Sequence, residues 1–205
     1  NFYSANTIFN DSGDVAAGGS IIGVTRSLAP GESYSGTYYA SGAVPAGMNY
    51  LTFQIDWGNS IAEMNETNNT RALSLLPDLV ITSAAITSKT ATQVNYSYTI
   101  KNNGGNTISN LYNVCLQNFY SANTIFNDSG DVAAGGSILG VNRSLAPGES
   151  YSGTYYASGA VPAGMYYLTF QIDWGNSIAE SNESNNTVAL ALYPDLVFTS
   201  AAVTS

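Results

Sequence analysis

Hydrophobic and polar residues alternate along much of the chain, in short runs separated by turns. The clearest alternating runs place one apolar set at Val94, Tyr96, Tyr98 and Ile100 and another at Tyr166, Leu168, Phe170 and Ile172. Because successive side chains of a β-strand point to opposite faces, such a run predicts a strand with one face toward a core. No stretch shows the period of an amphipathic helix, so the pattern predicts an all-β protein.

Clusters of Gly, Pro, Asn and Ser divide the alternating runs and predict turns. They lie at residues 102–105, 134–136, 146–148 and 162–164. The segments between them predict seven strands, near residues 79–87, 93–101, 111–120, 138–145, 150–157, 165–173 and 187–193. This number of short strands in one domain-sized segment predicts an immunoglobulin-like sandwich of two sheets.

A long internal repeat governs the organisation of the chain. The sequence NFYSANTIFNDSGDVAAGGS begins at Asn1 and again at Asn118, so the period is 118 − 1 = 117 residues. Residues 1–88 and 118–205 differ at only ten of 88 positions. A period of this length matches a whole domain and not the unit of a solenoid, so we expect tandem sandwiches.

We expect the repeat to begin at Pro77, because proline ends the preceding strand and an alternating pattern resumes after it. Residues 1–76 are then the C-terminal part of one repeat, 77–193 a complete repeat, and 194–205 the first strand of the next. Residues 1–76 lack the first strands of their domain. Either the chain is a window on a longer polymer, or neighbouring copies supply the missing strands.

Composition and charge exclude several classes of function. The chain has 5 Lys and Arg against 14 Asp and Glu, a net charge of −9, so nucleic acid is not expected as a partner. It has no histidine and one cysteine, Cys115, which removes the usual catalytic bases, the common zinc ligands and any internal disulfide. No apolar run is long enough to span a membrane. We therefore expect a protein that is not an enzyme.

The segment between the last two predicted strands is rich in carboxylates and side-chain amides, with no cation among them. The candidate metal ligands are Asp173, Asn176, Glu180, Asn182 and Glu183, with copies at Asp56, Asn59, Glu63, Asn65 and Glu66. Ca²⁺ collects several oxygen ligands and would neutralise these charges, so it is the expected cofactor. The alternative is a solvated turn in which these side chains bond to nearby backbone groups. In an immunoglobulin-like sandwich this hairpin lies at the pole where the repeat begins.

Sugar attachment and sugar binding are two further hypotheses. Asn10, Asn95, Asn127 and Asn142 begin Asn-x-Ser/Thr acceptor sequences and are the expected glycosylation sites. The chain also has 15 tyrosines, some of which must face outward. An outward ring could stack on a sugar or shield a strand edge, and the sequence leaves both readings open.

The complete repeat resembles the CARDB domain, the cell-adhesion-related domain found in bacteria and archaea. The matching motifs include Pro77-Asp78-Leu79-Val80, the turn at residues 145–149, and the closing segment from Asp173 to Asn186. The resemblance implies a seven-stranded sandwich used in tandem on cell surfaces or in secreted proteins. We expect a structural module of an extracellular fibre, stalk or filament, with neighbouring copies as partners. The alternative is an adhesin or carbohydrate-binding repeat with glycans as partners.

Overall fold

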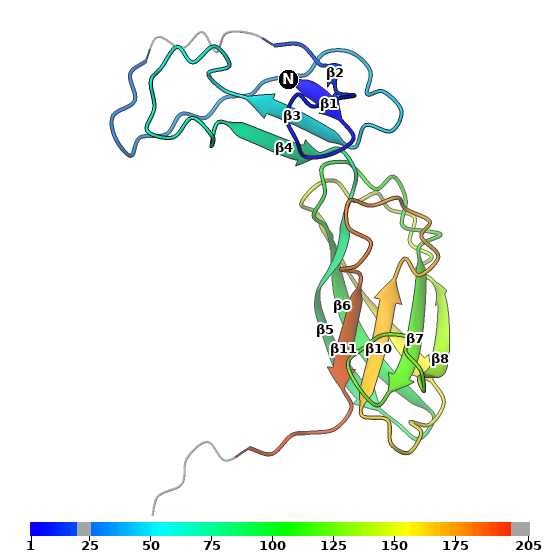
Figure 1. Ribbon diagram of the computed structural model, residues 1–205. Coiled ribbons are helices and arrows are strands. Elements are labelled where there is room, and N and C mark those ends of the chain that lie inside the picture. The colour runs from blue at the N-terminus through cyan, green and yellow to red at the C-terminus, as the bar shows by residue number, and fades with distance from the viewer. Residues whose placement is uncertain (20–25, 198–205) are drawn as a thin grey trace, which may run out of the picture. The chain divides into compact units, whose positions relative to one another are not determined.

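The chain folds into two compact units. The computed structural model describes residues 1–19 and 26–197, and its units are Asn1–Leu76 and Pro77–Ser205, called here the first and second unit (Figure 1). The described residues form strands, turns and irregular segments, and they include no helix that could cross a membrane. The prediction of an all-β protein is confirmed.

The second unit is a sandwich of two antiparallel sheets. Its strands are β5 (Leu79–Lys89), β6 (Gln93–Asn102), β7 (Cys115–Ser121), β8 (Val132–Ile138), β9 (Ser150–Ser158), β10 (Tyr167–Ile172) and β11 (Thr187–Ala191). One sheet has the order β11-β10-β7-β8 and the other the order β5-β6-β9. The seven-stranded immunoglobulin-like sandwich is thus confirmed, and no two strands that neighbour each other in a sheet run parallel.

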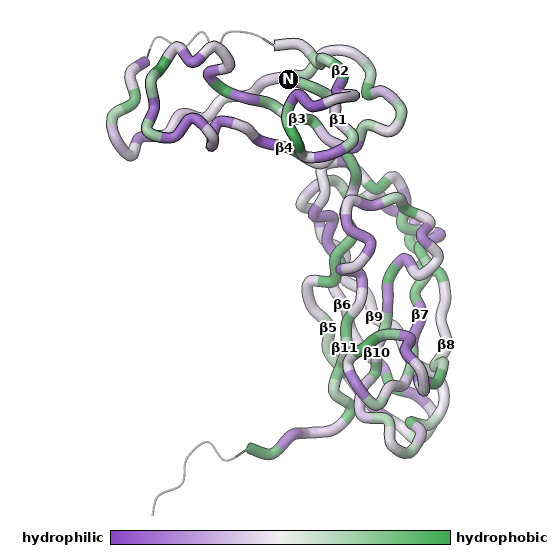
Figure 2. Tube along the Cα trace, viewed as in Figure 1, coloured by the Kyte–Doolittle hydropathy of each residue, from purple (hydrophilic) through white to green (hydrophobic). Residues whose placement is uncertain are grey.

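The core of the second unit comes from the alternating rows seen in the sequence. In β6 every second residue is buried, beginning at Val94, and in β10 Leu168, Phe170 and Ile172 are fully buried. The ring of Tyr96 stacks on Phe170 at 4.6 Å between centroids, which joins the two sheets. Figure 2 shows hydrophobic and hydrophilic segments mixed along the strands of this unit.

The predicted strand at 138–145 and the predicted turn at 134–136 are wrong. The fourth strand of the second unit, β8, contains these glycines, while 141 and 145 form only isolated bridges with Leu111 and Ile108. A side chain at Gly136 would lie 2.5 Å from the carbonyl oxygen of Leu116 on β7, so only glycine fits this close approach. The register shifts beside it, so the glycines mark a bulge in a strand and not its end.

The first unit contains one sheet of four strands. These are β1 (Phe2–Ser4), β2 (Val15–Ala16), β3 (Tyr50–Gln54) and β4 (Thr70–Ser74), in the order β2-β1-β3-β4. They are the copies of β7, β8, β10 and β11, joined in the same order. Residues 33–41 repeat the sequence of β9 but form no strand. The second sheet of the sandwich is therefore absent from the described residues of this unit.

Candidate functional site at the start of the repeat

The candidate site is the loop that joins β10 to β11, residues 173–186, which we call the acidic loop; its copy in the first unit is 56–69. The backbone enters each loop through two left-handed residues. In the second unit these are Asp173, with φ of 58°, and Asn176, with φ of 45°, and in the first Asp56 and Asn59 adopt similar angles. Asp and Asn tolerate this conformation better than most residues, which explains their spacing here.

Asp173 organises the beginning of the acidic loop. It is fully buried, and its carboxylate accepts hydrogen bonds from the amide and hydroxyl of Ser177 and, at 2.9 Å, from the amide of Ile178. Asp56 accepts equivalent amide bonds from Ser60 and Ile61. The donors that hold these oxygens lie four or five residues further along the same loop. Such local bonds are expected if the segment is a solvated turn.

Two further predicted ligands also bond within the loop. Glu183 accepts a hydrogen bond from the amide of Glu180 at 2.8 Å, and Asn182 accepts bonds from the amide and hydroxyl of Ser184. Their copies Glu66 and Asn65 make the same bonds in the first unit. The loop therefore takes its shape from its own sequence in both units.

Glu180 is different, because it reaches the first strand of the repeat. One carboxylate oxygen accepts a hydrogen bond from the amide of Leu79, and the other accepts one from Asn186 Nδ2 at 3.0 Å. Close by, the amide of Ser181 donates to the carbonyl of Pro77 at 2.9 Å. We call Glu180, Ser181 and Asn185, together with Pro77, Asp78 and Leu79, the strand latch.

Asp78 and Asn185 complete the strand latch. Asn185 Nδ2 donates to Asp78 Oδ1 at 2.9 Å, and Asp78 is itself buried. Three hydrogen bonds thus connect the acidic loop to the first three residues of the second unit. The expectation that this loop lies at the pole where the repeat begins is confirmed.

Burial, together with the charges of Glu183 and Asp173, raises the pKa of Glu180 to about 7, although the hydrogen bonds from Leu79 and Asn186 oppose the shift. The Oδ1 atom of Asn186 is buried and has no hydrogen-bond partner in the described structure. If the Asn186 side-chain amide turned over, its oxygen would face Glu180, and a protonated Glu180 could then donate to it, because a neutral carboxyl group carries one O–H donor.

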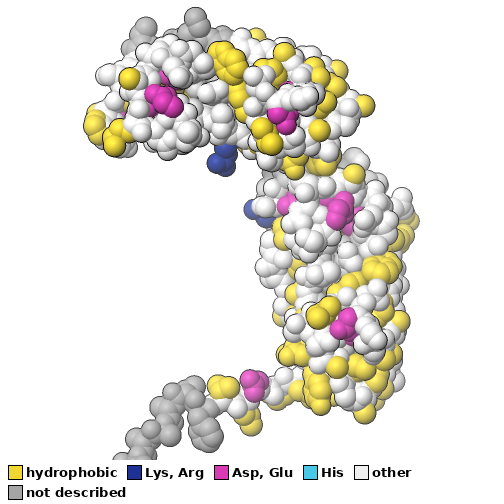
Figure 3. Space-filling view, in the orientation of Figure 1, with side chains coloured by type: hydrophobic (Ala, Val, Ile, Leu, Met, Phe, Trp, Pro, Cys, Tyr) yellow, Lys and Arg dark blue, Asp and Glu magenta, His cyan; other side chains and the backbone are white. Residues whose placement is uncertain are grey.

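The predicted metal ligands do not converge on one point. In the described parts of the chain, no three Asp, Glu, Cys or His side chains are grouped so that they could hold an ion. Asn176, Asn182 and Glu183 are exposed, whereas Asp173 and Glu180 are buried in separate hydrogen-bond networks. Figure 3 shows the acidic side chains as small separate groups on the surface.

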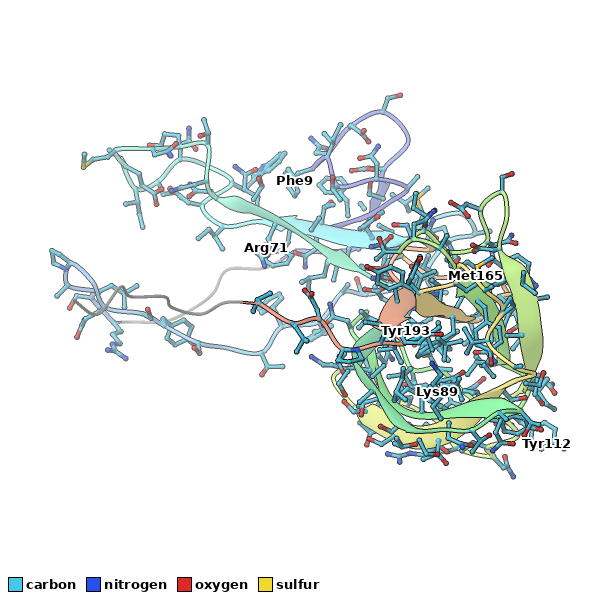
Figure 4. The ribbon with its side chains drawn as sticks, turned by 90° about the horizontal axis from the view of Figure 1, so that it is seen from below. Phe9, Arg71, Lys89, Tyr112, Met165 and Tyr193 are labelled. Carbon is cyan, nitrogen blue, oxygen red and sulfur yellow. The ribbon has the colours of Figure 1, made fainter. Side chains whose placement is uncertain are left out.

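The opposite pole of the second unit holds the departing chain in a comparable way. Lys89, at the end of β5, donates to the carbonyl of Leu192 at 3.4 Å, and its ammonium lies 3.7 Å from the ring centroid of Tyr193. Tyr166 packs edge-to-face against the same ring at 6.4 Å. Figure 4 labels Lys89 and Tyr193. We call Lys89, Tyr166 and Tyr193 the exit clamp.

Sequence reasoning found the acidic loop but not its partners. The sequence identifies Asp78 and Leu79 only as part of an opening motif, and it predicts no contact for Lys89 or Tyr193. Asn49 and Leu76 of the first unit are replaced by Tyr166 and Tyr193 in the second, so the first repeat has no tyrosine at either position of this pair.

The expected glycosylation sites lie on the surface. Asn10, Asn127 and Asn142 are exposed, while Asn95 lies on the outer face of β6 and donates to Ser88 at 2.8 Å. Modification of these residues stays a prediction.

The outward aromatic residues next to the acidic loop form a cluster of Phe119, Phe126 and Trp174. The rings of Phe126 and Trp174 lie 5.5 Å apart at 67°, and those of Phe119 and Phe126 lie 5.3 Å apart at 86°. Edge-to-face packing of this kind holds the loop after β7 against the sheet and offers no flat platform for a sugar ring. Sugar binding stays a prediction.

Comparison with known proteins agrees with the resemblance seen in the sequence. The CARDB family model matches residues 1–73 and 76–190. A search of curated protein sequences gave no match. A crystal structure of a CARDB domain from Pyrococcus furiosus in complex with di-metal ions is 19% identical, covers 57% of this chain and 93% of its own, and has a TM-score of 0.38.

Two other solved structures are similar to the chain. The solution structure of the same Pyrococcus furiosus domain is 20% identical, covers 57% of this chain and 94% of its own, and has a TM-score of 0.37. β-Glucosidase 3B from Thermotoga neapolitana in complex with glucose is 16% identical over 49% of this chain, with a TM-score of 0.31. The match spans only 14% of that enzyme.

Proposed function

Because the chain belongs to the CARDB family, whose non-catalytic domains are generally found in bacterial surface or secreted proteins, we propose that it is a structural module of an extracellular fibre, stalk or filament. In this proposal, tandem sandwiches follow one another end to end and transmit tension along the array. Neighbouring repeats of the same kind are its partners.

The strand latch is the observation that carries the proposal. The preceding repeat ends at Leu76, and the latch binds Pro77, Asp78 and Leu79 directly after it. The two repeats are joined at Leu75-Leu76-Pro77 without a Gly- or Ser-rich linker of the kind that makes a tether flexible. A repeat whose first residues are held by buried hydrogen bonds resists fraying when it is pulled from its N-terminus.

The exit clamp supports the same role at the other pole. Lys89 and Tyr166 hold Tyr193, which directly precedes Pro194, the first residue of the next repeat. Tyr193-Pro194 occupies the position that Leu76-Pro77 occupies one repeat earlier. Both ends of the complete repeat, residues 77–193, are therefore held within a residue or two of the repeat boundary.

The test is the stiffness of a chain that carries several consecutive repeats. Small-angle scattering and electron microscopy should show a rod whose length grows in proportion to the number of repeats. Replacing Glu180 by alanine in every repeat should increase bending at the junctions. Asp128→Ala, which removes a carboxylate from the loop after β7 and outside the latch, should not. Globules joined by flexible tethers in the unmodified chain would overturn the proposal.

We also propose that Ca²⁺ stabilises the acidic loop. The support is chemical: three carboxylates without a cation, and two buried amide oxygens, of Asn185 and Asn186, that have no described partner. Because the carboxylates do not converge, an ion would bind few of them and would take its remaining ligands from amide oxygens and water.

A further inference from the structure

The second unit has one long edge strand with a regular, unprotected edge. The outermost strands of a sheet present rows of unpaired N–H and C=O groups, which proteins commonly interrupt with bulges, proline or charge. Of the four edge strands that the structure describes in this unit, β5 and β8 pair with register shifts, and β11 has only five residues. In contrast, β9 pairs with β6 over nine consecutive residues without a shift.

The backbone groups of Ser152 and Thr154 point away from β6. In an antiparallel pair every second residue exchanges hydrogen bonds with the partner strand, and the residues between turn their backbone groups outward. The amide of Asn102 donates to the carbonyl of Glu149 at 3.0 Å, and the regular register extends this bonded set to the odd-numbered residues of β9. The outward groups of Ser152 and Thr154 bond no other segment of the described structure.

The free part of this edge runs from Ser150 to Thr154. Just beyond it the opposite sheet covers the edge, because Asn118 Nδ2 donates to the carbonyl of Tyr156 at 3.3 Å. The whole of β9 contains no proline and no charged residue. A straight, neutral stretch of unpaired backbone groups is therefore available to a further strand.

We propose that β9 of one copy of this chain pairs antiparallel with β9 of a second copy. Ser152 of each copy lies opposite Thr154 of the other, so that their N–H and C=O groups bond each other and Gly153 lies at the two-fold axis. One sequence supplies both sides, because antiparallel pairing of an edge with itself is symmetric and closed. The sheets β5-β6-β9 of the two copies then form one continuous sheet.

The side chains of β9 also fit a second copy. Ser152 and Thr154 are exposed on the outer face of the sheet, and the pairing brings their hydroxyl groups opposite each other. Tyr156 is 48% exposed and comes beside Ser150 of the second copy in this register, so the contact covers part of its ring. The chain has a net charge of −9, but its neutral β9 strands meet without like charges.

This inference goes beyond the proposed end-to-end role, because it joins neighbouring arrays side by side. The experiment is analytical ultracentrifugation of the 205-residue chain from about 10 μM to about 1 mM. About four backbone hydrogen bonds predict weak association, with a dissociation constant on the order of 100 μM. The average mass should rise with concentration toward that of a dimer; a constant monomer mass would overturn the inference.

Hydrogen exchange identifies the strand that pairs. At about 10 μM the amides of Ser152 and Thr154 should exchange quickly, whereas the amide of Gly153, which bonds β6, should be protected. At about 1 mM exchange at Ser152 and Thr154 should slow about fivefold, because about four fifths of the chains are then paired. Association without slower exchange at these two amides would place the contact elsewhere and overturn the inference.

A pair of charged variants tests the register. Ser152→Glu and Thr154→Lys change exposed side chains, so both chains should fold. An equimolar mixture places the new carboxylate opposite the new ammonium group and should associate about threefold more tightly than either variant alone. Ser83→Glu, at the far edge of the same sheet, is the matched control and should give no gain with Thr154→Lys. Equal gains in the two mixtures would overturn the register.

A proline variant removes one of the bonds between copies. Thr154→Pro deletes an outward N–H and no bond to β6, so it should weaken association at least tenfold, and melting curves verify that it folds. Thr154→Val keeps the N–H and should stay within about threefold of the unmodified chain. Unchanged association of a folded Thr154→Pro chain would overturn the inference. A monomeric chain whose multi-repeat form is still a stiff rod would overturn the side-by-side pairing alone and leave the proposed function standing.

Discussion

Residues 1–76 in the first unit and residues 118–193 in the second have almost the same sequence, yet the two segments differ in structure. Residues 150–158 form β9, paired along their whole length with β6, whereas the copy at 33–41 forms no strand. Only the second unit contains β5 and β6. A β-strand needs a partner for its backbone hydrogen bonds, so the same residues are a strand in one unit and irregular in the other.

Local structure, by contrast, is the same in both units. The edge-to-face pair Phe2–Phe9 has centroids 5.3 Å apart at 85°, and its copy Phe119–Phe126 has 5.3 Å and 86°. Asp56 and Asp173 bond corresponding backbone amides. Contacts between residues close in sequence therefore form without the second sheet, and contacts that require β5 and β6 do not.

The largest difference should follow from removing a core ring. Phe170→Ala removes a fully buried side chain that stacks on Tyr96 and should destabilise the second unit by about 3–5 kcal/mol. Phe53→Ala, at the same position of the first unit, should cost less than about 1 kcal/mol, because Phe53 is only half-buried and the described residues of this unit form no second sheet over it. Each unit has one tryptophan, so urea unfolding followed by fluorescence of Trp57 or Trp174 alone, in W174F or W57F backgrounds, reports each unit separately. Equal losses would contradict the comparison.

A smaller difference is expected at the strand with the bulge. In Gly136→Ala the new Cβ would lie 2.5 Å from the Leu116 carbonyl oxygen, so the variant should destabilise the second unit by about 1–3 kcal/mol. A methyl group at Gly175 would lie 3.7 Å from Cys115 Sγ, an ordinary contact, so Gly175→Ala should change stability by less than about 0.5 kcal/mol. The same fluorescence assay measures both variants. Equal losses in the two variants would contradict the close approach at Gly136.

Loss of the strand-latch hydrogen bonds should lower the stability of the second unit by a similar or slightly smaller amount. Glu180→Ala leaves the buried amides of Leu79 and Asn186 without an acceptor and should cost the second unit about 1–3 kcal/mol. Glu63→Ala removes an exposed carboxylate and should cost less than about 0.5 kcal/mol. Hydrogen exchange provides the site-specific measurement: protection of the Leu79 amide should fall in Glu180→Ala. Unchanged protection would show that the latch does not hold the strand.

The raised pKa of Glu180 predicts a pH dependence confined to the second unit. Its pKa rises from 4.5 to about 7 on folding, so the folded state keeps a proton that the unfolded state has lost between these pH values. The stability from this group is therefore complete below about pH 4.5 and is lost as the pH rises to about 7.

Glu180→Gln isolates that effect, because a neutral amide can accept from Leu79 and, once the Asn186 side-chain amide turns over, donate to the Asn186 oxygen. The variant should melt about 2–4 °C above the unmodified chain at pH 8, with the gap narrowing toward pH 5. Melting curves across this range provide the measurement, and Glu63→Gln is the matched control. A gap that widens toward acidic pH would contradict the assignment.

The smallest expected effect is that of calcium. Because the carboxylates of the acidic loop do not converge, adding Ca²⁺ after chelation should raise the melting temperature of the second unit by only about 1–2 °C. Differential scanning calorimetry with Ca²⁺, Mg²⁺ or chelator measures the shift. A melting temperature that does not respond to Ca²⁺, or responds equally to Mg²⁺, would remove calcium from the proposed function.

The sequence by itself determined the repeat period, the all-β class, the inward row from Val94 to Ile100 and the turn built on Asp173. Each of these depends on spacing or on bonds within a few residues. Only the tertiary structure decided that Gly136 lies inside a strand, that Glu180 bonds Leu79, 101 positions away, and that residues 33–41 are not a strand. Each of these features requires a backbone group that is distant in sequence. The spacing of nearby residues does not indicate where that group will lie.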